Sequence, residues 1–137
     1  MNRAELKTCM EETYNAVSDF PWESDPDYEV FRHCNNKKWF ALIMNISKAK
    51  LGLPSDEMTD VVNLKCDPLL IGSLRSEPGI FPAYHMSKEH WITVSLDGSV
   101  PDDKLKMLLD MSFELTSAKS KRKTANKSAA GKEEYRL

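Results

Sequence analysis

The stretch "YHMSKEHWITVSLDG", residues 84–98, contains the clearest strand signal in the chain. Within "HWITVSL", residues 90–96, two sets of side chains alternate: the apolar Ile92, Val94 and Leu96, and the outward set Trp91, Thr93 and Ser95. Because successive side chains of a strand point to opposite faces of a sheet, the apolar set is predicted to line a core and the other set to face away from it. The stretch is therefore both a core wall and part of a candidate site.

The segments on both sides of this strand have the periods of further strands and of helices. Apolar residues recur every three or four positions over residues 3–18 and again over residues 99–118, which predicts an amphipathic helix in each range. Strands are predicted at residues 28–33, 39–46, 59–66, 83–86 and 90–96, and a short helix capped by Asp67 at about residues 68–76. This order predicts an α+β fold: a mainly antiparallel β-sheet with the N- and C-terminal helices packed on one face, in two layers.

Local signals refine these boundaries. Asn35-Asn36, in the turn at residues 34–38, suits the positive φ of a tight hairpin turn. Ser99 and Asp102 form a capping-box-like pair before the last helix, which is expected to end near Ala118. Residues 119–137 carry 7 Lys and Arg against 2 Asp and Glu and few apolar side chains. We therefore expect one domain over residues 1–118 and a flexible basic tail over residues 119–137.

Alternation assigns the other strand residues to faces. The predicted helix-facing set is Phe40, Leu42, Met44 and Ile46 in residues 39–46, and Val62, Leu64 and Cys66 in residues 59–66. The predicted outward set is Trp39, Ala41, Ile43 and Asn45, and Val61, Asn63 and Lys65. An outer face with two tryptophans is too aromatic for an idle solvent face. Two explanations are open: loops at residues 19–27 or 47–58 or a dimer partner cover it, or it binds a ligand or nucleic acid.

The bulk properties limit the class of protein. The 137 residues fit one domain, and the longest apolar run, residues 39–44, is far below the roughly 20 residues of a membrane-spanning helix. The first residues lead directly into a charged amphipathic pattern, so a cytoplasmic protein without a membrane segment is expected. The 3 cysteines are far apart in sequence, which favours buried free thiols. Residues 1–118 carry 12 Lys and Arg against 19 Asp and Glu, so the predicted domain is acidic.

No catalytic or metal-binding constellation is predicted. His85 and His90 are five positions apart and lack a Cys or carboxylate that would complete a metal-ligand set. The 5 glycines are isolated, so no phosphate-cradling loop is predicted. Cys66 is expected to face inward, and Ser87 lacks the glycines of a nucleophile turn. We expect no cofactor and no enzymatic activity, although a general-base role for a histidine stays open as a third possibility.

Two features favour nucleic-acid binding. Sheet-face aromatic side chains with interspersed hydrogen-bonding groups can stack on unpaired bases. Positive charge that could contact phosphate is found at the hairpin tip, at Lys37 and Lys38, and also at Lys48, Lys50, Lys65 and Lys88 and in the tail. The acidic balance of the predicted domain opposes phosphate binding wherever these lysines are not locally concentrated.

The sequence also resembles the MmcQ/YjbR-like family. The resemblance rests on Asn63 to Pro68, Pro78-Gly79, Tyr84 to Met86, His90-Trp91, Leu96 to Gly98 and Pro101 to Asp103, with the upstream segment "VFRHCNNKKWFAL". It covers about residues 3–118. It implies a CyaY-like fold and a DNA-binding role through a "double wing" of hairpins. Matching positions nominate Asn63, Lys65, Tyr84, His85, Lys88, His90 and Trp91 as nucleic-acid-binding residues.

Together these observations predict a non-enzymatic binding protein. The first hypothesis is a DNA- or nucleic-acid-binding protein whose contacts are Lys37, Lys38 and the seven nominated residues, assisted by the basic tail at residues 119–137. The alternative is a protein-interaction module that uses the helix-free sheet face in a homodimer or against another partner. A salt-dependent affinity for DNA would favour the first hypothesis, and a dimer that Trp91→Ala dissociates would favour the second.

Overall fold

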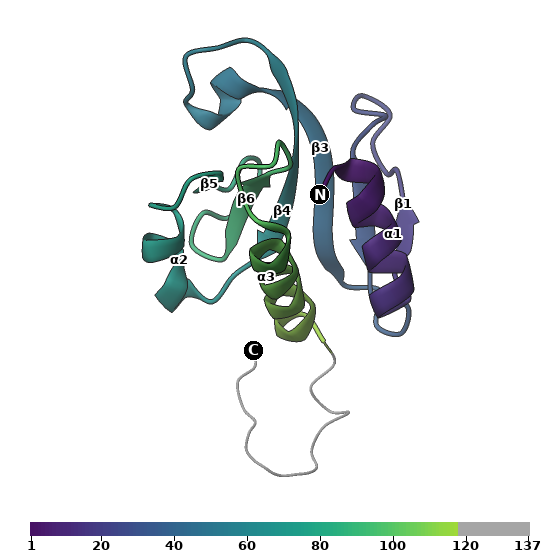
Figure 1. Ribbon diagram of the computed structural model, residues 1–137. Helices are drawn as coiled ribbons and strands as arrows, with labels where there is room; N and C mark the ends of the chain where they lie inside the picture. The colour runs from purple at the N-terminus through teal and green to yellow at the C-terminus, as the bar shows by residue number, and fades with distance from the viewer. Residues whose placement is uncertain (118–137) are drawn as a thin grey trace.

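The computed structural model describes residues 1–117 of the chain, which form one antiparallel sheet with helices (Figure 1). The elements in chain order are α1 (Arg3–Tyr14), β1 (Val17–Asp19), β2 (Glu29–Arg32), β3 (Trp39–Ser47), the 3-10 helix η1 (Lys48–Leu51), β4 (Met58–Lys65), α2 (Pro68–Leu74), β5 (Ile80–Pro82), β6 (Trp91–Ser95) and α3 (Asp102–Leu115). The six strands lie in the order β1-β2-β3-β4-β6-β5, and every neighbouring pair is antiparallel. The predicted α+β class is confirmed.

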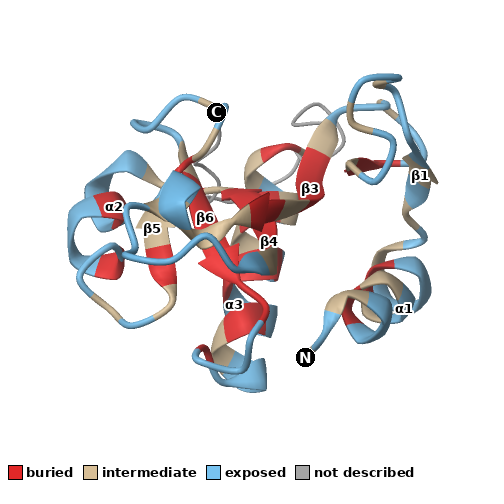
Figure 2. Ribbon diagram, turned by 90° about the horizontal axis from the view of Figure 1, so that it is seen from above, coloured by how far each residue is buried: buried red, intermediate tan, exposed pale blue. Residues whose placement is uncertain are grey.

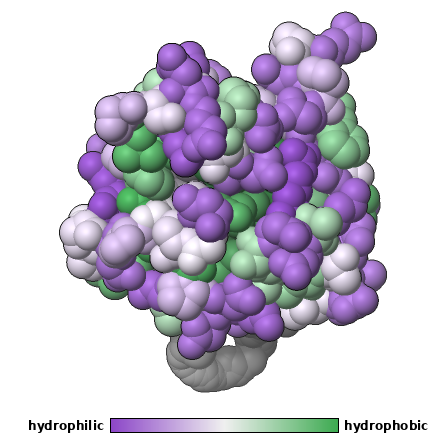
Figure 3. All heavy atoms as spheres, turned by 45° about the horizontal axis from the view of Figure 1, so that its top comes forward, coloured by the Kyte–Doolittle hydropathy of each residue, from purple (hydrophilic) through white to green (hydrophobic). Residues whose placement is uncertain are grey.

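The helices pack on one face of the sheet. Leu6 and Met10 of α1 and Leu105, Leu108 and Leu109 of α3 share a buried cluster with residues of β3, β4 and β6. Figure 2 shows that burial is concentrated in the central strands and on the sides of the helices that face them. The surface seen in Figure 3 is mostly hydrophilic, with smaller hydrophobic areas between. The burial of the apolar side chains between the helices and the sheet is the main interaction that stabilises the packing of the two layers.

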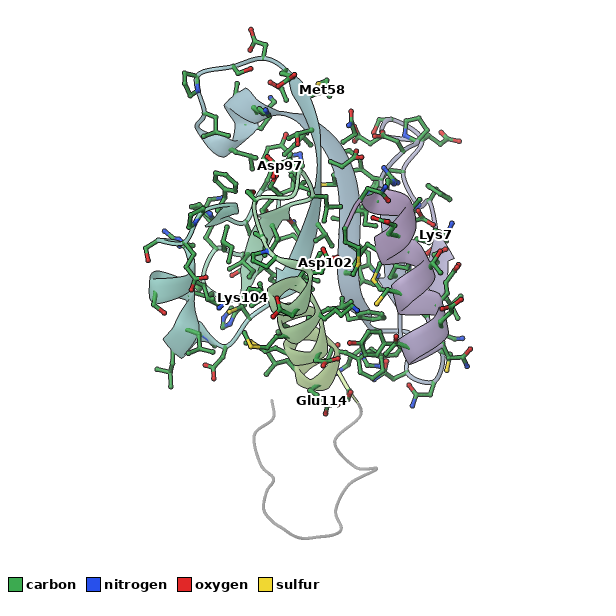
Figure 4. The ribbon with its side chains drawn as sticks, viewed as in Figure 1. Lys7, Met58, Asp97, Asp102, Lys104 and Glu114 are labelled. Atoms are coloured by element: carbon green, nitrogen blue, oxygen red, sulfur yellow. The ribbon has the colours of Figure 1, made fainter. Side chains whose placement is uncertain are left out.

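An ion pair links α1 to the sheet in addition to apolar packing. Glu29 of β2 is 2% exposed, and its carboxylate lies 2.8 Å from Lys7 Nζ and 3.6 Å from the Arg3 guanidinium. Lys7 is labelled on α1 in Figure 4. A buried carboxylate needs such partners, because an unpaired buried charge is strongly destabilising.

The opposite face of the sheet carries a second core. Val30, Leu42, Met44, Ile46 and Val61 are buried there. The side chains that pack over them come mainly from loops and turns: Trp22, Tyr28, Trp39, Leu51, Tyr84 and Met86. We call this side the helix-free face. Loop residues therefore cover part of the helix-free face, in agreement with the explanation that loops shield its aromatic side chains.

A β-bulge in β3 overturns half of the predicted face assignment. Arg32 pairs with Trp39 but Phe31 pairs with Ala41, so Phe40 has no partner in β2 and lies on the helix face together with Ala41. An extra residue shifts every later side chain to the other face. The predicted sides of Trp39 and Phe40 are right. Those of the later residues are wrong: Leu42, Met44 and Ile46 lie on the helix-free face, and Ala41, Ile43 and, by alternation, Asn45 on the helix face.

Ser112 of α3 sits where the ladder between β3 and β4 ends. Its hydroxyl donates to the Phe40 carbonyl oxygen at 2.5 Å and accepts from the Lys65 amide at 2.9 Å. The residue is fully buried. Helix α3 thus supplies the hydrogen bonds that the two strands do not exchange at this point.

Several boundaries differ from the prediction. Helix α1 ends at Tyr14, because Asn15 takes a left-handed conformation with φ 55°, and Val17 belongs to β1 rather than to the helix. The positive φ of the hairpin turn, 63°, is at Lys37 and not at Asn35-Asn36. The strand predicted at residues 83–86 is wrong: the strand is β5, and residues 83–86 lie in a turn region.

The observed helix caps agree with the predicted ones at α2 but not at α3. The Asp67 carboxylate accepts from the Leu69 amide at 3.0 Å, and Pro68 is the first residue of α2, as predicted. Pro101 is the N-cap residue of α3 and makes no side-chain cap; Ser99 instead donates to Asp97 at 2.6 Å. The end predicted near Ala118 and the predicted tail at residues 119–137 lie outside the described residues. No helix in the described part of the chain is long and apolar enough to cross a membrane.

Candidate ligand-binding face

The strands place the predicted outward residues of β4 and β6 on the helix-free face. Cross-strand pairing joins Lys65 to Trp91 and Asn63 to Thr93. The core-facing partners Ile92 and Val94 lie in the helix-side cluster, as predicted. Sequence alternation therefore assigned the residues of these two strands to the correct faces of the sheet, since no bulge interrupts the pairing of β4 with β6.

Asn63 is a structural residue of the face. The side chains of Asn63 and Thr93 are both 0% exposed. Thr93 Oγ1 donates to Asn63 Oδ1 at 2.5 Å and accepts from the Tyr84 amide at 2.9 Å, while Asn63 Nδ2 donates to the Tyr84 carbonyl oxygen at 2.8 Å. These bonds hold Tyr84 against the sheet. Asn63 therefore positions the turn at residues 84–90 and has no surface to offer a ligand.

The turn at residues 84–90 presents several of the nominated side chains. His85 has a φ of 66°, and its ring centroid lies 4.0 Å from that of Tyr84. Lys88 Nζ donates to the Ala83 carbonyl oxygen at 2.9 Å, and the Ser87 carbonyl oxygen accepts from the His90 and Trp91 amides. His85, Lys88 and His90 are exposed, and Trp91 is half-buried.

Two turns meet at one end of the sheet. β4 ends at Lys65 and β6 begins at Trp91, and β3 begins at Trp39 after the hairpin turn that carries Lys37 and Lys38. Because neighbouring strands are antiparallel, both turns and these strand ends lie together. We call Lys37, Lys38, Lys65, Lys88, His90 and Trp91 the basic end. It lies at the end of the sheet opposite to Met58, which is labelled in Figure 4.

The last turn of α3 is anchored at the same end. His33 Nε2 lies 2.7 Å from Thr116 Oγ1, and Asn36 Nδ2 donates to the Thr116 carbonyl oxygen at 3.1 Å. The His33 ring stacks on Phe113 at 4.1 Å between centroids. Burial is the main cause that lowers the pKa of His33. The hairpin turn is therefore held in place by the helix that packs behind it.

A cavity of about 420 Å³ lies on the helix-free face beside the basic end. It is lined by Trp22, Asp25, Tyr28, Trp39, Leu42, Met44, His85 and Met86, and we call it the aromatic pocket. The Trp22 ring stands nearly perpendicular to the Tyr28 ring, at 80° and 6.2 Å, and to the Trp39 ring, at 89° and 5.6 Å. Burial, followed by the charge of Asp25, raises the pKa of Tyr28.

Sequence reasoning found only part of this pocket. The sequence nominates His85 as a binding residue and predicts that Trp39 faces outward, but it assigns Trp22 and Tyr28 to no site. The available signal was two aromatic side chains in the otherwise acidic segment "WESDPDY", residues 22–28.

The histidines and cysteines do not converge in the described part of the chain. Among residues 1–117, no group of three or more His, Cys, Asp and Glu side chains is arranged to hold a metal ion. Cys66 is buried, and burial with the nearby Asp67 raises the pKa of its thiol to about 11, which disfavours the reactive thiolate. The three cysteines are free thiols.

Comparison with known proteins identifies the family. The YjbR family model matches residues 11–115. The chain is 41% identical to the uncharacterized protein YyaQ of Bacillus subtilis over 116 residues, which is 85% of this chain and 98% of YyaQ. It is 41% identical to the uncharacterized protein YjbR of Escherichia coli over 59 residues, which is 42% of this chain and 50% of that protein.

Solved structures agree with this assignment. A crystal structure of a Pseudomonas syringae protein has 49% identity and a TM-score of 0.83, over 85% of this chain and all of that one. DR2400 of Deinococcus radiodurans has 28% identity and a TM-score of 0.66, over 89% of this chain and 83% of that one. The motifs at residues 63–68 and 84–91 thus led to the right family, and the chain belongs to the YjbR family.

Proposed function

We propose that this YjbR-family protein is a non-enzymatic, nucleic-acid-binding protein that contacts its ligand through the basic end. The observation that carries the proposal is the cross-strand pair of Lys65 and Trp91 on the helix-free face. A half-buried indole beside a lysine combines a stacking surface for a base with a charge for a phosphate. Lys37, Lys38 and Lys88 extend positive charge over the two neighbouring turns.

The chemistry favours unpaired bases. Stacking of a base on an aromatic side chain contributes about 1–3 kcal/mol, and it requires a base that is free of its helical stack. Lysine contacts to phosphate release counterions, so the affinity they add falls as salt rises. Single-stranded DNA or RNA can use both interactions at the basic end.

The lysines of the basic end take part in no ion pair among residues 1–117. The ion pairs of residues 1–117 engage other cations, namely the N-terminal amine, Arg3, Lys7, Arg32, Lys48 and Lys104. The lysines of the basic end make none of them, and neither do Lys50, Arg75 and Lys106. The Nζ atoms of Lys37 and Lys88 donate to the main-chain carbonyl oxygens of Cys34 and Ala83. What supports the proposal is therefore that no carboxylate of residues 1–117 competes with a phosphate for the four lysines of the basic end.

The experiment compares two double variants of equal charge. Lys65→Ala with Lys88→Ala removes two charges from the basic end, and Lys50→Ala with Lys106→Ala removes two exposed charges from η1 and α3. Binding of a fluorescent single-stranded oligonucleotide is measured by anisotropy over a salt series. We expect the first variant to lose affinity and to reduce the salt slope by about one per phosphate contact removed, with the control close to the original protein. Equal effects of both variants would refute the proposal.

The half-buried Trp91 also favours a second candidate, a homodimer or other protein interface on the helix-free face. A protein interface would make Trp91→Ala convert a dimer into a monomer in sedimentation without changing oligonucleotide affinity. If Trp91 contacts nucleic acid instead, Trp91→Ala would lower the oligonucleotide affinity and leave the sedimentation behaviour unchanged. The two candidates are therefore separated by one variant and two measurements.

A cytoplasmic location without membrane attachment belongs to the same proposal. Three free thiols, of which Cys34 is exposed, fit a reducing compartment.

A further inference from the structure

We propose that the aromatic pocket binds a small organic cation of the alkylammonium class. This site is separate from the basic end and goes beyond the proposed nucleic-acid function. The proposal rests on the ring geometry, on the charge of the lining and on the contacts that a neighbouring ring makes.

The rings form the walls of a box. Trp22 stands perpendicular to both Tyr28 and Trp39, so the pocket is bounded by aromatic surfaces that point in different directions. An aromatic face carries negative charge density, which attracts a cation within about 6 Å of the ring centroid. Several rings around one cavity are the arrangement that recognises quaternary and methylated ammonium groups.

The lining has a carboxylate that suits a cation. Asp25 lines the pocket and is half-buried, and the hydroxyl of Ser24 lies 3.4 Å from its Oδ2. The ion pairs of residues 1–117 leave Asp25 without a cationic partner. A cation bound in the pocket would therefore have a carboxylate at its wall that no cation of the described residues already pairs with.

Next to the pocket, a cation of the protein itself already lies between an aromatic ring and a carboxylate. The Arg32 guanidinium lies 5.4 Å from the centroid of the Trp39 ring, and Asp19 accepts from Arg32 Nε at 3.1 Å. Arg32 is not among the residues that line the pocket. The described part of the chain has this combination at a second place, where Lys7 Nζ lies 5.9 Å from the centroid of the Phe20 ring and 2.8 Å from the Glu29 carboxylate.

The size and remaining lining fit an alkylated group. The volume of about 420 Å³ is within the roughly 300–1,000 Å³ of small-molecule sites. Leu42, Met44 and Met86 offer apolar contacts for methyl groups. Glu23, Asp25 and Asp27 belong to the same loop and would repel a phosphate, which disfavours a nucleotide here.

The test uses a charged ligand and its neutral isostere. Choline and 3,3-dimethyl-1-butanol have the same shape but differ in charge. Binding to the full chain is measured by NMR titration of the tryptophan indole signals. We expect saturable shifts with choline and much weaker shifts with the alcohol. Equal binding of both compounds, or no saturable binding of choline up to tens of millimolar, would overturn the proposal.

Two variants locate the site. Asp25→Asn is expected to reduce choline affinity by about tenfold, and Trp22→Leu to abolish saturable binding. Asp27→Asn is the matched control: it removes an exposed charge from the same loop without touching the pocket lining, and it should change affinity little. Equal effects of the two aspartate variants would mean that only the general charge of the loop matters. Oligonucleotide affinity should be unchanged in Asp25→Asn, which separates this test from that of the basic end.

Discussion

Replacing Thr93 by Val should loosen the turn at residues 84–90 without disturbing the core. The two side chains have the same shape, and both favour a strand. The substitution removes a hydroxyl that donates to Asn63 and accepts from the Tyr84 amide. The change in stability therefore reports the loss of these hydrogen bonds and not a change in packing.

The magnitude follows from the groups left without partners. Each buried polar group that loses its hydrogen bond costs about 1–3 kcal/mol. Asn63 Oδ1 is fully buried, whereas the Tyr84 amide belongs to a half-buried residue that water can reach after a small movement. We expect the free energy of unfolding to fall by about 2–4 kcal/mol.

Urea unfolding followed by circular dichroism measures this loss, and hydrogen exchange of the Tyr84 amide measures the local effect. The control is Thr59→Val in β4, where the hydroxyl makes none of the hydrogen bonds described for residues 1–117. Thr93→Val should expose the Tyr84 amide to exchange, and the control should not. Stability within about 0.5 kcal/mol of the original protein, with a protected Tyr84 amide, would refute the anchoring role.

Three further predictions concern stability. Gly79→Ala should destabilise by about 2–4 kcal/mol, because φ is +83° and an added Cβ would lie 2.4 Å from Ser99 Oγ. Gly98→Ala, with φ +94° and open space around the Cβ, should show only the backbone cost of about 1 kcal/mol. Asp67→Ala should remove the N-cap of α2 and cost about 1 kcal/mol in urea unfolding. Stability should fall as the pH is lowered below about 6.5 towards the lowered pKa of His33, because the unfolded state there binds a proton that the folded state does not. His33→Gln should flatten that pH dependence.

Each of these has a result that would contradict it. Equal losses in the two glycine variants would show that the close contact at Gly79 relaxes freely. An unchanged midpoint for Asp67→Ala would mean that water replaces the cap. An equally steep acid dependence in His33→Gln would assign the titration to other groups.

The sequence was informative where local rules decide the structure. Alternation placed Ile92 and Val94 on the helix face and Trp91 on the other, and Asp67-Pro68 marked the start of α2. These features depend on neighbours in the chain. The family resemblance was likewise carried by short local motifs.

The remainder depends on contacts between distant segments. The bulge at Phe40 is visible only in the pairing of β3 with β2, and one unrecognised residue reversed the faces of Leu42 and Ile43. The pocket joins Trp22 to His85, which are far apart in sequence. Propensity also misplaced the left-handed residue of the hairpin turn, since tertiary contacts of Asn36 with Thr116 fix that turn.

The position of Ser112 has a consequence for how the helix layer and the sheet layer move. Its hydroxyl bridges the Phe40 carbonyl and the Lys65 amide, so a slide of α3 by one turn, about 5.4 Å, would leave three buried polar groups without partners. Apolar contacts alone would allow α3 to pack against the sheet in several positions along its axis, whereas the hydrogen bonds of Ser112 form in only one of them. The hydroxyl therefore fixes the position of α3 along its own axis relative to the sheet. Because it holds the main chain of Lys65, a residue on the helix layer determines where a charge stands on the opposite side of the protein.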